Sequence, residues 1–213
     1  MFRVLLILFL LSTSVSAGPW PREEGKGFLS FSLDLDAEEF DDNFVSFYLE
    51  YGLSRGRTLV IDRQERGDEI AKTFALIRFP IGDESRNLKL AYDVGLGTVD
   101  SHFALRTGLS IGRGWSMGNR SGWWTIDSRA LLLEEGNEGI FESDLTFGIQ
   151  VTDRLKAISQ LQGGFPSEGD AYAKFAQSFV LQTSKTRHYL LGVTTGLYEA
   201  DSLQINIGLW QDF

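Results

Sequence analysis

The sequence lacks cysteine, so no disulfide can stabilise the fold. It is also poor in helix signals, because apolar residues rarely recur at spacings of three and four. Beyond the N-terminal region, no stretch approaches the ~18 uninterrupted apolar residues of a membrane helix. Two histidines in 213 residues carry little information about a site. Hydrogen bonds between strands and side-chain packing must therefore hold the chain together.

Basic residues are outnumbered as well. The chain has 20 Lys and Arg against 29 Asp and Glu, which gives a formal net charge of −9. An acidic chain is poorly suited to binding nucleic acid or an anionic membrane surface. Nothing in the sequence implies a cofactor.

The N-terminal region has the layout of a secretory signal peptide. Arg3 precedes an apolar run over residues 4–11, and a short polar stretch leads to a small-x-small triplet at residues 15–17. The run is too short for the ~20 residues of a spanning helix. The pattern predicts a signal peptide over residues 1–17, cleaved after Ala17, and a single mature domain over residues 18–213.

Period-two alternation of apolar and polar residues continues through the mature chain. Such alternation is typical of strands with one apolar face. The expected strands cover 29–35, 45–51, 57–66, 70–80, 88–96, 103–111, 122–134, 141–151, 155–163, 171–183, 189–197 and 202–213. Short polar turns between them favour antiparallel hairpins. The count is twelve, or ten if one of the weaker pairs does not form.

The polar face of these strands decides between two all-β architectures. A soluble barrel or sandwich turns its apolar face inward, whereas a membrane barrel turns it outward to lipid. Here the polar face combines many small residues with interleaved charges, which suits a lumen better than a solvated surface. The prediction is a closed antiparallel up-and-down transmembrane β-barrel. The lumen-lining candidates are Asp34, Glu50, Lys89, Asp93, Arg106, Glu142 and Asp144, with Gln150 and Asn206 on the same face.

Aromatic residues gather near the expected strand ends and turns, where a membrane barrel carries its interfacial girdles. The candidates for these girdles are Trp20, Tyr51, Tyr92, Trp115, Trp123, Trp124, Tyr189, Tyr198 and Trp210.

The chain ends in "LQINIGLWQDF", in which alternating apolar residues lead to Phe213. This terminal strand resembles the C-terminal assembly signal of bacterial outer-membrane β-barrels. The resemblance implies an outer-membrane location and recognition of Phe213 by the barrel-insertion machinery. The stretch "GPWPREEGKGFLSFSLDL" is similar to the start of proteobacterial barrel proteins without an assigned activity. Outer-membrane lipid and lipopolysaccharide are the surroundings this implies.

An even strand number puts both termini on the periplasmic side. The turns then sort by charge, with acidic ones such as "DAEEFDDN" outside and mostly basic ones such as "GRGWSMGNRSG" inside. Outer loops this short are unusual for a receptor or a gated porin.

His102 is the one candidate for catalysis. It follows Asp100 and Ser101 at an expected outer turn, where an outer-membrane hydrolase would place a serine–histidine pair. Sequence neighbours on a strand point to opposite faces, however, and His188 lies in a periplasmic turn. A surface histidine is the favoured interpretation.

The acidic outer loop offers oxygen ligands for a divalent ion in Glu38, Glu39, Asp41, Asp42 and Asn43. Their spacing is not that of an EF-hand, so a solvated loop is favoured and no metal site is predicted. Divalent ions bridging this loop to lipopolysaccharide phosphates are a weaker alternative.

The glycine clusters at 95–97 and 112–114 lack the strand–loop–helix setting of a nucleotide site. Inside a barrel, glycine more simply leaves room for curvature or for a neighbouring side chain.

Three functions remain open. The favoured one is a small outer-membrane barrel that is not an enzyme and that passes or holds small polar or cationic solutes, or is filled and structural. The alternatives are an outer-membrane hydrolase or lipid-A-modifying enzyme, and a soluble periplasmic β-barrel with an apolar ligand. The lumen acids outnumber the bases placed with them, which predicts a preference for cations.

Overall fold

The computed structural model of the chain describes residues 18–37, 43–67, 69–83, 85–134, 139–167, 169–200 and 203–213. The expected signal peptide, residues 1–17, lies outside the described residues. So do Glu38, Glu39, Asp41 and Asp42 of the acidic loop. Within the described part of the chain, no helix is long and apolar enough to cross a membrane.

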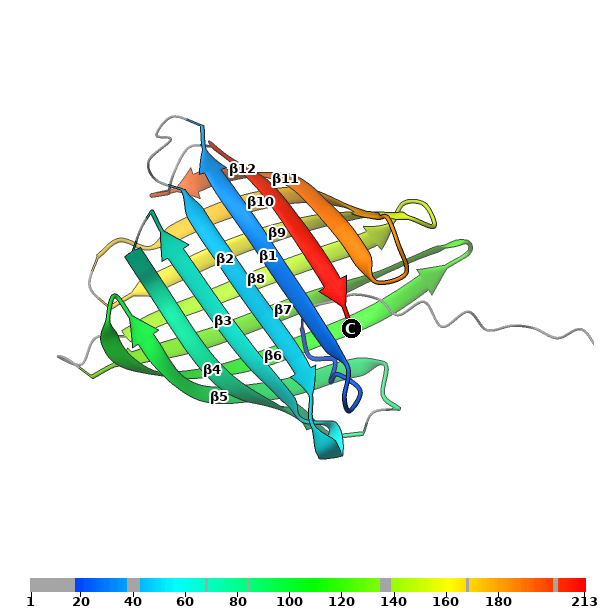
Figure 1. The fold of residues 1–213 in the computed structure, drawn as a ribbon, viewed down its shortest axis with the longest axis horizontal. Helices are drawn as coiled ribbons and strands as arrows, with labels where there is room; N and C mark the ends of the chain where they lie inside the picture. The colour runs from blue at the N-terminus through cyan, green and yellow to red at the C-terminus, as the bar shows by residue number, and fades with distance from the viewer. Residues whose placement is uncertain are drawn as a thin grey trace, which may run out of the picture.

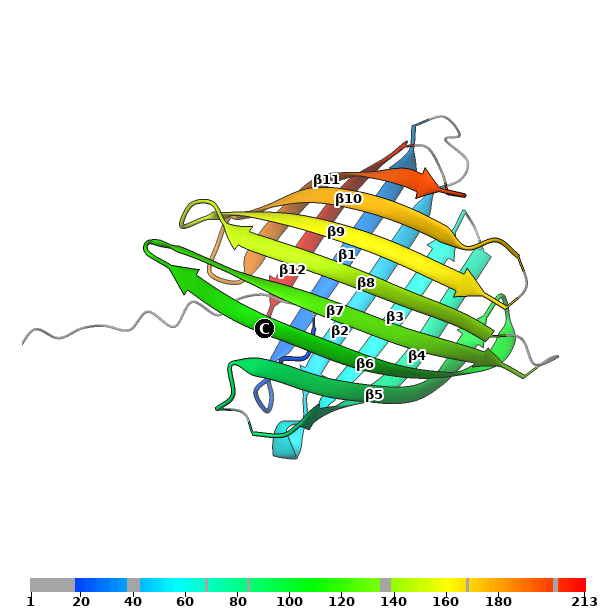
Figure 2. The same cartoon turned by 180° about the vertical axis from the view of Figure 1, so that it is seen from behind.

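Twelve strands form one closed barrel (Figures 1 and 2), which confirms the expected fold and strand number. They are β1 (Gly27–Asp36), β2 (Phe44–Gly52), β3 (Thr58–Arg66), β4 (Glu69–Ile81), β5 (Leu88–Val99), β6 (His102–Met117), β7 (Arg120–Leu133), β8 (Gly139–Gln150), β9 (Leu155–Pro166), β10 (Tyr172–Gln182), β11 (Arg187–Tyr198) and β12 (Leu203–Asp212). A single 3-10 turn, η1 (Ser54–Gly56), joins β2 to β3. Each strand pairs antiparallel with its neighbours in sequence, as the short turns predict.

The first and last strands, β1 and β12, close the barrel. β1 pairs antiparallel with β12, from Phe28 opposite Asp212 to Asp36 opposite Gln204. The start of β1 and the end of β12 therefore lie at the same rim, as Figure 1 shows. Closure leaves no strand with a free edge, which a sheet in lipid requires because no water is there to satisfy its backbone groups.

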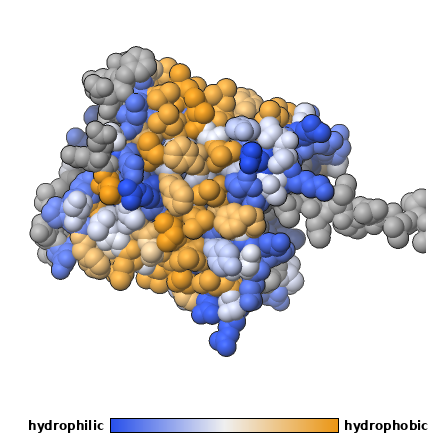
Figure 3. Space-filling view, viewed as in Figure 1, coloured by the Kyte–Doolittle hydropathy of each residue, from blue (hydrophilic) through white to orange (hydrophobic). Residues whose placement is uncertain are grey.

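The outer face of the barrel is apolar. Phe31, Leu145 and Ile205 are 45%, 46% and 41% exposed, and Leu191 reaches 60%. Figure 3 shows apolar side chains gathered over the middle of the face that carries β1, β2 and β12, with hydrophilic residues towards its ends. Water would penalise so large an apolar surface, whereas lipid does not. The chain therefore has the lipid-facing surface of a transmembrane β-barrel, and the alternative of a soluble barrel with its apolar face inward is wrong.

The aromatic prediction is only partly right. Tyr51, Tyr92, Tyr189 and Tyr198 face outward and are exposed, as a girdle requires. Three tryptophans of the predicted set instead lie inside the barrel, where they pack together: Trp20, Trp123 and Trp210. Proximity to a strand end does not determine which face a residue occupies, because the face depends on its parity within the strand.

The expected long periplasmic turn "GRGWSMGNRSG" is mostly strand. β6 and β7 continue to pair beyond Gly112 opposite Thr125, as far as Met117 opposite Arg120. The turn consists of Gly118, with a φ of 63° that suits glycine, and one further residue. Glycines at 112, 114 and 122 weaken the strand pattern in the sequence, but the paired backbones still complete the ladder.

Candidate functional site

The barrel lumen is the candidate site. Because strand side chains alternate, every second residue of each strand points inward. The inward residues enclose a cavity of about 740 Å³ with lining residues from all twelve strands. We call the rim with the start of β1 and the end of β12 the periplasmic end, as the even strand number predicts, and the opposite rim the outer end. The cavity extends from Arg66 and Glu199 at the outer end to Gly18, Trp123 and Trp210 towards the periplasmic end.

Most of the predicted lumen residues meet in this cavity. Its lining includes Asp34, Asp93, Arg106, Glu142 and Asp144. They reach it because they lie on the inward parity of β1, β5, β6 and β8. Their role in conducting a solute stays a prediction.

Two predicted residues lie elsewhere. Glu50 is only 1% exposed and is covered by Tyr48 and Arg78, so it points inward without lining the free space. Lys89 is partly buried on the inward parity near the periplasmic start of β5, below the cavity.

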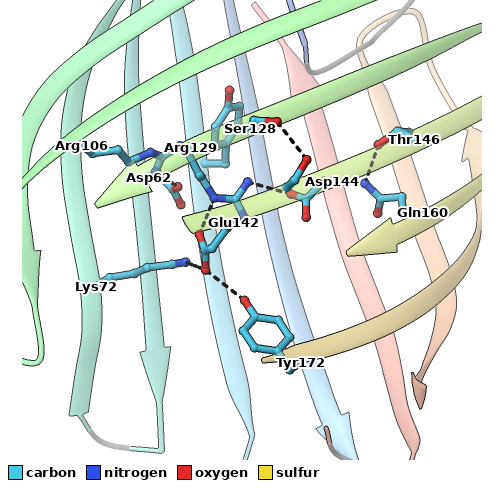
Figure 4. A network of polar contacts seen from close by, with 12 residues as sticks. Asp62, Lys72, Arg106, Ser128, Arg129, Glu142, Asp144, Thr146, Gln160 and Tyr172 are labelled. Carbon is cyan, nitrogen blue, oxygen red and sulfur yellow. Dashed lines mark hydrogen bonds and ion pairs between the residues drawn. The ribbon is translucent and has the colours of Figure 1, made fainter. Parts of the chain in front are cut away.

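An ion-pair network lies in the outer half of the lumen (Figure 4). The Arg129 guanidinium contacts Glu142 at 2.5 Å and Asp144 at 2.7 Å. Lys72 Nζ lies 3.6 Å from Glu142 Oε1, and the Tyr172 hydroxyl donates to the same oxygen at 3.1 Å. Lys72 comes from β4 and Glu142 from β8, so this contact spans the lumen and narrows it.

A second network is centred on Glu50. Its carboxylate contacts Arg78 Nη1 and Arg22 Nε, both at 2.6 Å, and accepts from the Tyr48 hydroxyl at 2.7 Å. Arg78 also donates to the carbonyl oxygen of Gly18 at 2.9 Å. A buried carboxylate needs such partners, because an unpaired charge in a low-dielectric interior is costly.

A separate ion pair, outside these two networks, joins β6 to β3. Arg106 Nη1 lies 2.5 Å from Asp62 Oδ2, and its guanidinium stands 5.5 Å from the centre of the Phe74 ring. This pair again links strands that are not neighbours. Alternation identifies the inward face of a strand, but it does not reveal which inward residue lies opposite.

The networks change the expected charge balance of the lumen. Among the described residues, the acidic ones that line the cavity number seven: Asp34, Asp62, Asp93, Asp127, Glu142, Asp144 and Glu199. The basic ones number six: Arg66, Lys72, Arg78, Arg106, Arg129 and Lys174. Sequence reasoning missed Asp62, Asp127 and Arg129, because strands 57–66 and 122–134 had no clear face assignment.

The wall of the lumen formed by β9–β12 and β1 is mainly uncharged and polar. Asn206 Nδ2 donates to Asp34 Oδ1 at 2.7 Å, and Asn206 Oδ1 accepts from the Thr194 hydroxyl at 3.0 Å. Gln160 donates to Thr146 at 3.1 Å. Serines continue this surface at positions 30, 32 and 178. A solute in the cavity therefore meets paired charges on one side and hydroxyl and amide groups on the other.

The N-terminal residues form the floor of the cavity. Pro19 is fully buried, and Trp20 packs against a buried cluster of Trp123, Ile158 and Val180. A Cβ on Gly112 would lie 2.9 Å from the Trp20 ring and 3.0 Å from Pro19. The cluster at 112–114 thus includes a glycine that leaves room for a neighbouring side chain, as expected.

The histidines do not come together. His102 is exposed at the outer start of β6, while His188 is 3% exposed inside the periplasmic start of β11. Among the described residues, no group of three or more His, Cys, Asp or Glu side chains could hold a metal ion.

Comparison with known proteins identifies the fold alone. No protein-family model matches the chain, and no curated protein matches it. Among solved structures, the KdgM porin has a TM-score of 0.65 at 9% identity, covering 87% of this chain and 99% of its own. The NanC porin has a TM-score of 0.68 at 6% identity, with coverage of 86% and 98%. An outer membrane channel from Pseudomonas putida F1 has a TM-score of 0.57 at 11% identity, with coverage of 93% and 100%.

Proposed function

We propose that the protein is a narrow passive channel of the outer membrane for small polar solutes, with a weak preference for cations. The observation that carries the proposal is the polar cavity with lining residues from every strand. Eight strands enclose a lumen that side chains just fill, and sixteen leave an aqueous channel. Twelve strands lie between these cases, which suits a narrow path.

The charges of the lumen argue for weak selectivity. Seven acidic and six basic side chains of the described residues line the cavity, and several of them form ion pairs with each other. Paired charges cancel much of each other's field, whereas strong selectivity needs a ring of one sign. The small acidic excess favours cations modestly.

Conductance in a planar bilayer under a salt gradient tests the proposal. We expect a small conductance whose reversal potential is displaced towards that of the cation. A reversal potential directed towards the anion would contradict the charge argument. The channel would be contradicted if the folded barrel carried no current, either as the mature chain or as a variant that lacks residues 18–24.

A filled structural barrel is the second candidate. The contacts that favour it are Lys72 with Glu142 and Arg106 with Asp62, because both cross between non-neighbouring strands. The two candidates differ in the swelling of liposomes that contain the protein. A channel admits a small neutral solute such as glycerol faster than empty liposomes do, and a filled barrel does not.

A further inference from the structure

We infer that residues 18–26 are a plug that closes the periplasmic end of the lumen and must leave it for solute to pass. The plug's position rests on its own contacts, while its effect on conduction rests on the proposed channel.

The chain turns back into the barrel at the periplasmic rim. Lys26 N donates to the Glu23 carbonyl at 3.0 Å, which forms a tight turn before β1. Gly25 N donates to the Gly52 carbonyl at 3.0 Å, and Gly52 N donates to the Lys26 carbonyl at 2.8 Å. A Cβ on Gly52 would lie 1.9 Å from the Glu23 carbonyl oxygen. The wall at Gly52 therefore accommodates this turn only because it has no side chain there.

Inside the lumen the plug has an apolar seat. Trp20 enters the cluster of Trp123, Ile158 and Val180, with Leu190 and Trp210 against it. Gly18 has a φ of +134°, and a Cβ on it would lie 2.8 Å from Thr125 Cγ2. Only glycine fits this conformation and this space. The apolar packing fixes the plug at one depth in the barrel.

Three polar side chains of the wall, which we call the latch, hold the plug. Arg78 donates to the Gly18 carbonyl at 2.9 Å, and Glu50 contacts Arg22 at 2.6 Å. The Thr58 hydroxyl accepts from Arg22 N at 3.1 Å. Arg78 also contacts Glu50 at 2.6 Å, so one buried ion pair anchors both ends of residues 18–22. Neutralising Glu50 weakens both attachments together.

The plug can leave without opening the barrel. It precedes β1, which begins at Gly27, and the latch consists of side chains rather than a strand ladder. The strand pairings that close the wall do not involve residues 18–26. Release of residues 18–24 therefore costs the apolar packing and the latch, while the backbone hydrogen bonds that Gly25 and Lys26 make with Gly52 at the rim can stay. These are the properties of a removable gate.

Conductance gives the first half of the test. We expect the mature chain without residues 18–24, and the full mature chain with Glu50→Gln, to conduct severalfold more than the unmodified mature chain. Arg22→Gln removes the plug's partner of Glu50 and is the second variant, for the case in which Glu50→Gln does not fold. Glu23→Gln is the matched control, because its exposed side chain lies on the plug outside the latch. Equal conductance of all folded variants would overturn the gate.

Thiol labelling gives the second half and does not depend on conduction. The chain has no cysteine, so Pro19→Cys introduces one buried thiol in the plug and Ser32→Cys one in the cavity. A hydrophilic maleimide should label Pro19→Cys slowly and Ser32→Cys fast. Adding the latch variant should accelerate labelling of Pro19→Cys alone. Fast labelling of Pro19→Cys in the otherwise unmodified chain would overturn the plug. Slow labelling together with a silent plug-free barrel would overturn the gating role and the proposed channel, while leaving residues 18–26 as a structural filler.

Discussion

Gly27 and Phe213 exchange two backbone hydrogen bonds across the seam that closes the barrel. Gly27 N donates to the Phe213 carbonyl at 2.8 Å, and Phe213 N donates back to the Gly27 carbonyl at 3.0 Å. The Phe213 ring covers Gly27 so closely that a Cβ there would lie 2.2 Å from the ring. Phe213 is thus fastened to the first strand through both its backbone and its ring.

Deleting Phe213 should reduce the amount of folded barrel in the outer membrane more than it reduces the stability of the barrel once folded. The folded state loses two backbone hydrogen bonds, about 1–3 kcal/mol at ~0.5–1.5 kcal/mol each. Assembly loses the residue that the resemblance assigns to the insertion signal. The measurements are the yield of the heat-modifiable form from cells and the urea midpoint of refolded protein. An unchanged yield from cells would remove the assembly role.

Gly27→Ala should destabilise the seam. The added methyl group meets the Phe213 ring, and such overpacking costs ~1–3 kcal/mol. Phe213→Ala removes the obstacle, so in a double-mutant cycle the second change should recover much of the loss. Urea unfolding in phospholipid vesicles gives the four free energies of unfolding. Simple additivity would mean that the two residues do not meet in the folded barrel.

Because the outer face of β11 contacts lipid, the cost in stability of an arginine on that face should fall from the middle of the strand to its end. Val193 lies near the middle of the strand and Tyr198 at its end, and both are exposed, at 47% and 60%. Val193→Arg should lower the free energy of unfolding by ~2–4 kcal/mol, and Tyr198→Arg by only ~0–1 kcal/mol. Urea unfolding in phospholipid vesicles measures the free energy of unfolding of both variants. Equal costs at the two positions would contradict this placement of the strand in the bilayer.

The alternation of the sequence was sufficient to predict the twelve strands and the outward face, because side-chain parity is a local property of a strand. It also placed Asp93, Arg106 and Glu142 on the inner face. It did not reveal that Arg78 and Arg22 share Glu50, because that contact depends on how strands across the lumen are staggered. Such stagger is set by closure of the whole barrel and leaves no local pattern.

The plug was missed for a related reason. Residues 18–26 precede the first strand and have no periodicity, so nothing in them predicts a place inside the lumen. Trp20 was assigned to a girdle because it lies close to the start of β1. The signals that could have indicated the plug are the glycines at 52 and 112, each of which leaves room for its backbone or side chains. Without the structure, these glycines equally suit curvature of the barrel.

The final prediction concerns Arg129 and the selectivity of the proposed channel. Arg129 contacts two carboxylates, Glu142 and Asp144, in the outer network. Arg129→Gln leaves a net negative pair beside the cavity, so the reversal potential under a salt gradient should move further towards that of the cation. Leaving partly buried charges unpaired should also cost stability, up to the ~3–5 kcal/mol seen for fully buried pairs.

Asp144→Asn is the matched change of opposite sign on the same contact. It should move the reversal potential towards the anion while leaving Arg129 paired with Glu142. The two variants together separate charge from structural damage, because general damage would shift selectivity in the same direction for both. Equal reversal potentials in the unmodified protein, Arg129→Gln and Asp144→Asn would mean that ions do not pass this network, which would contradict the proposed path through the cavity.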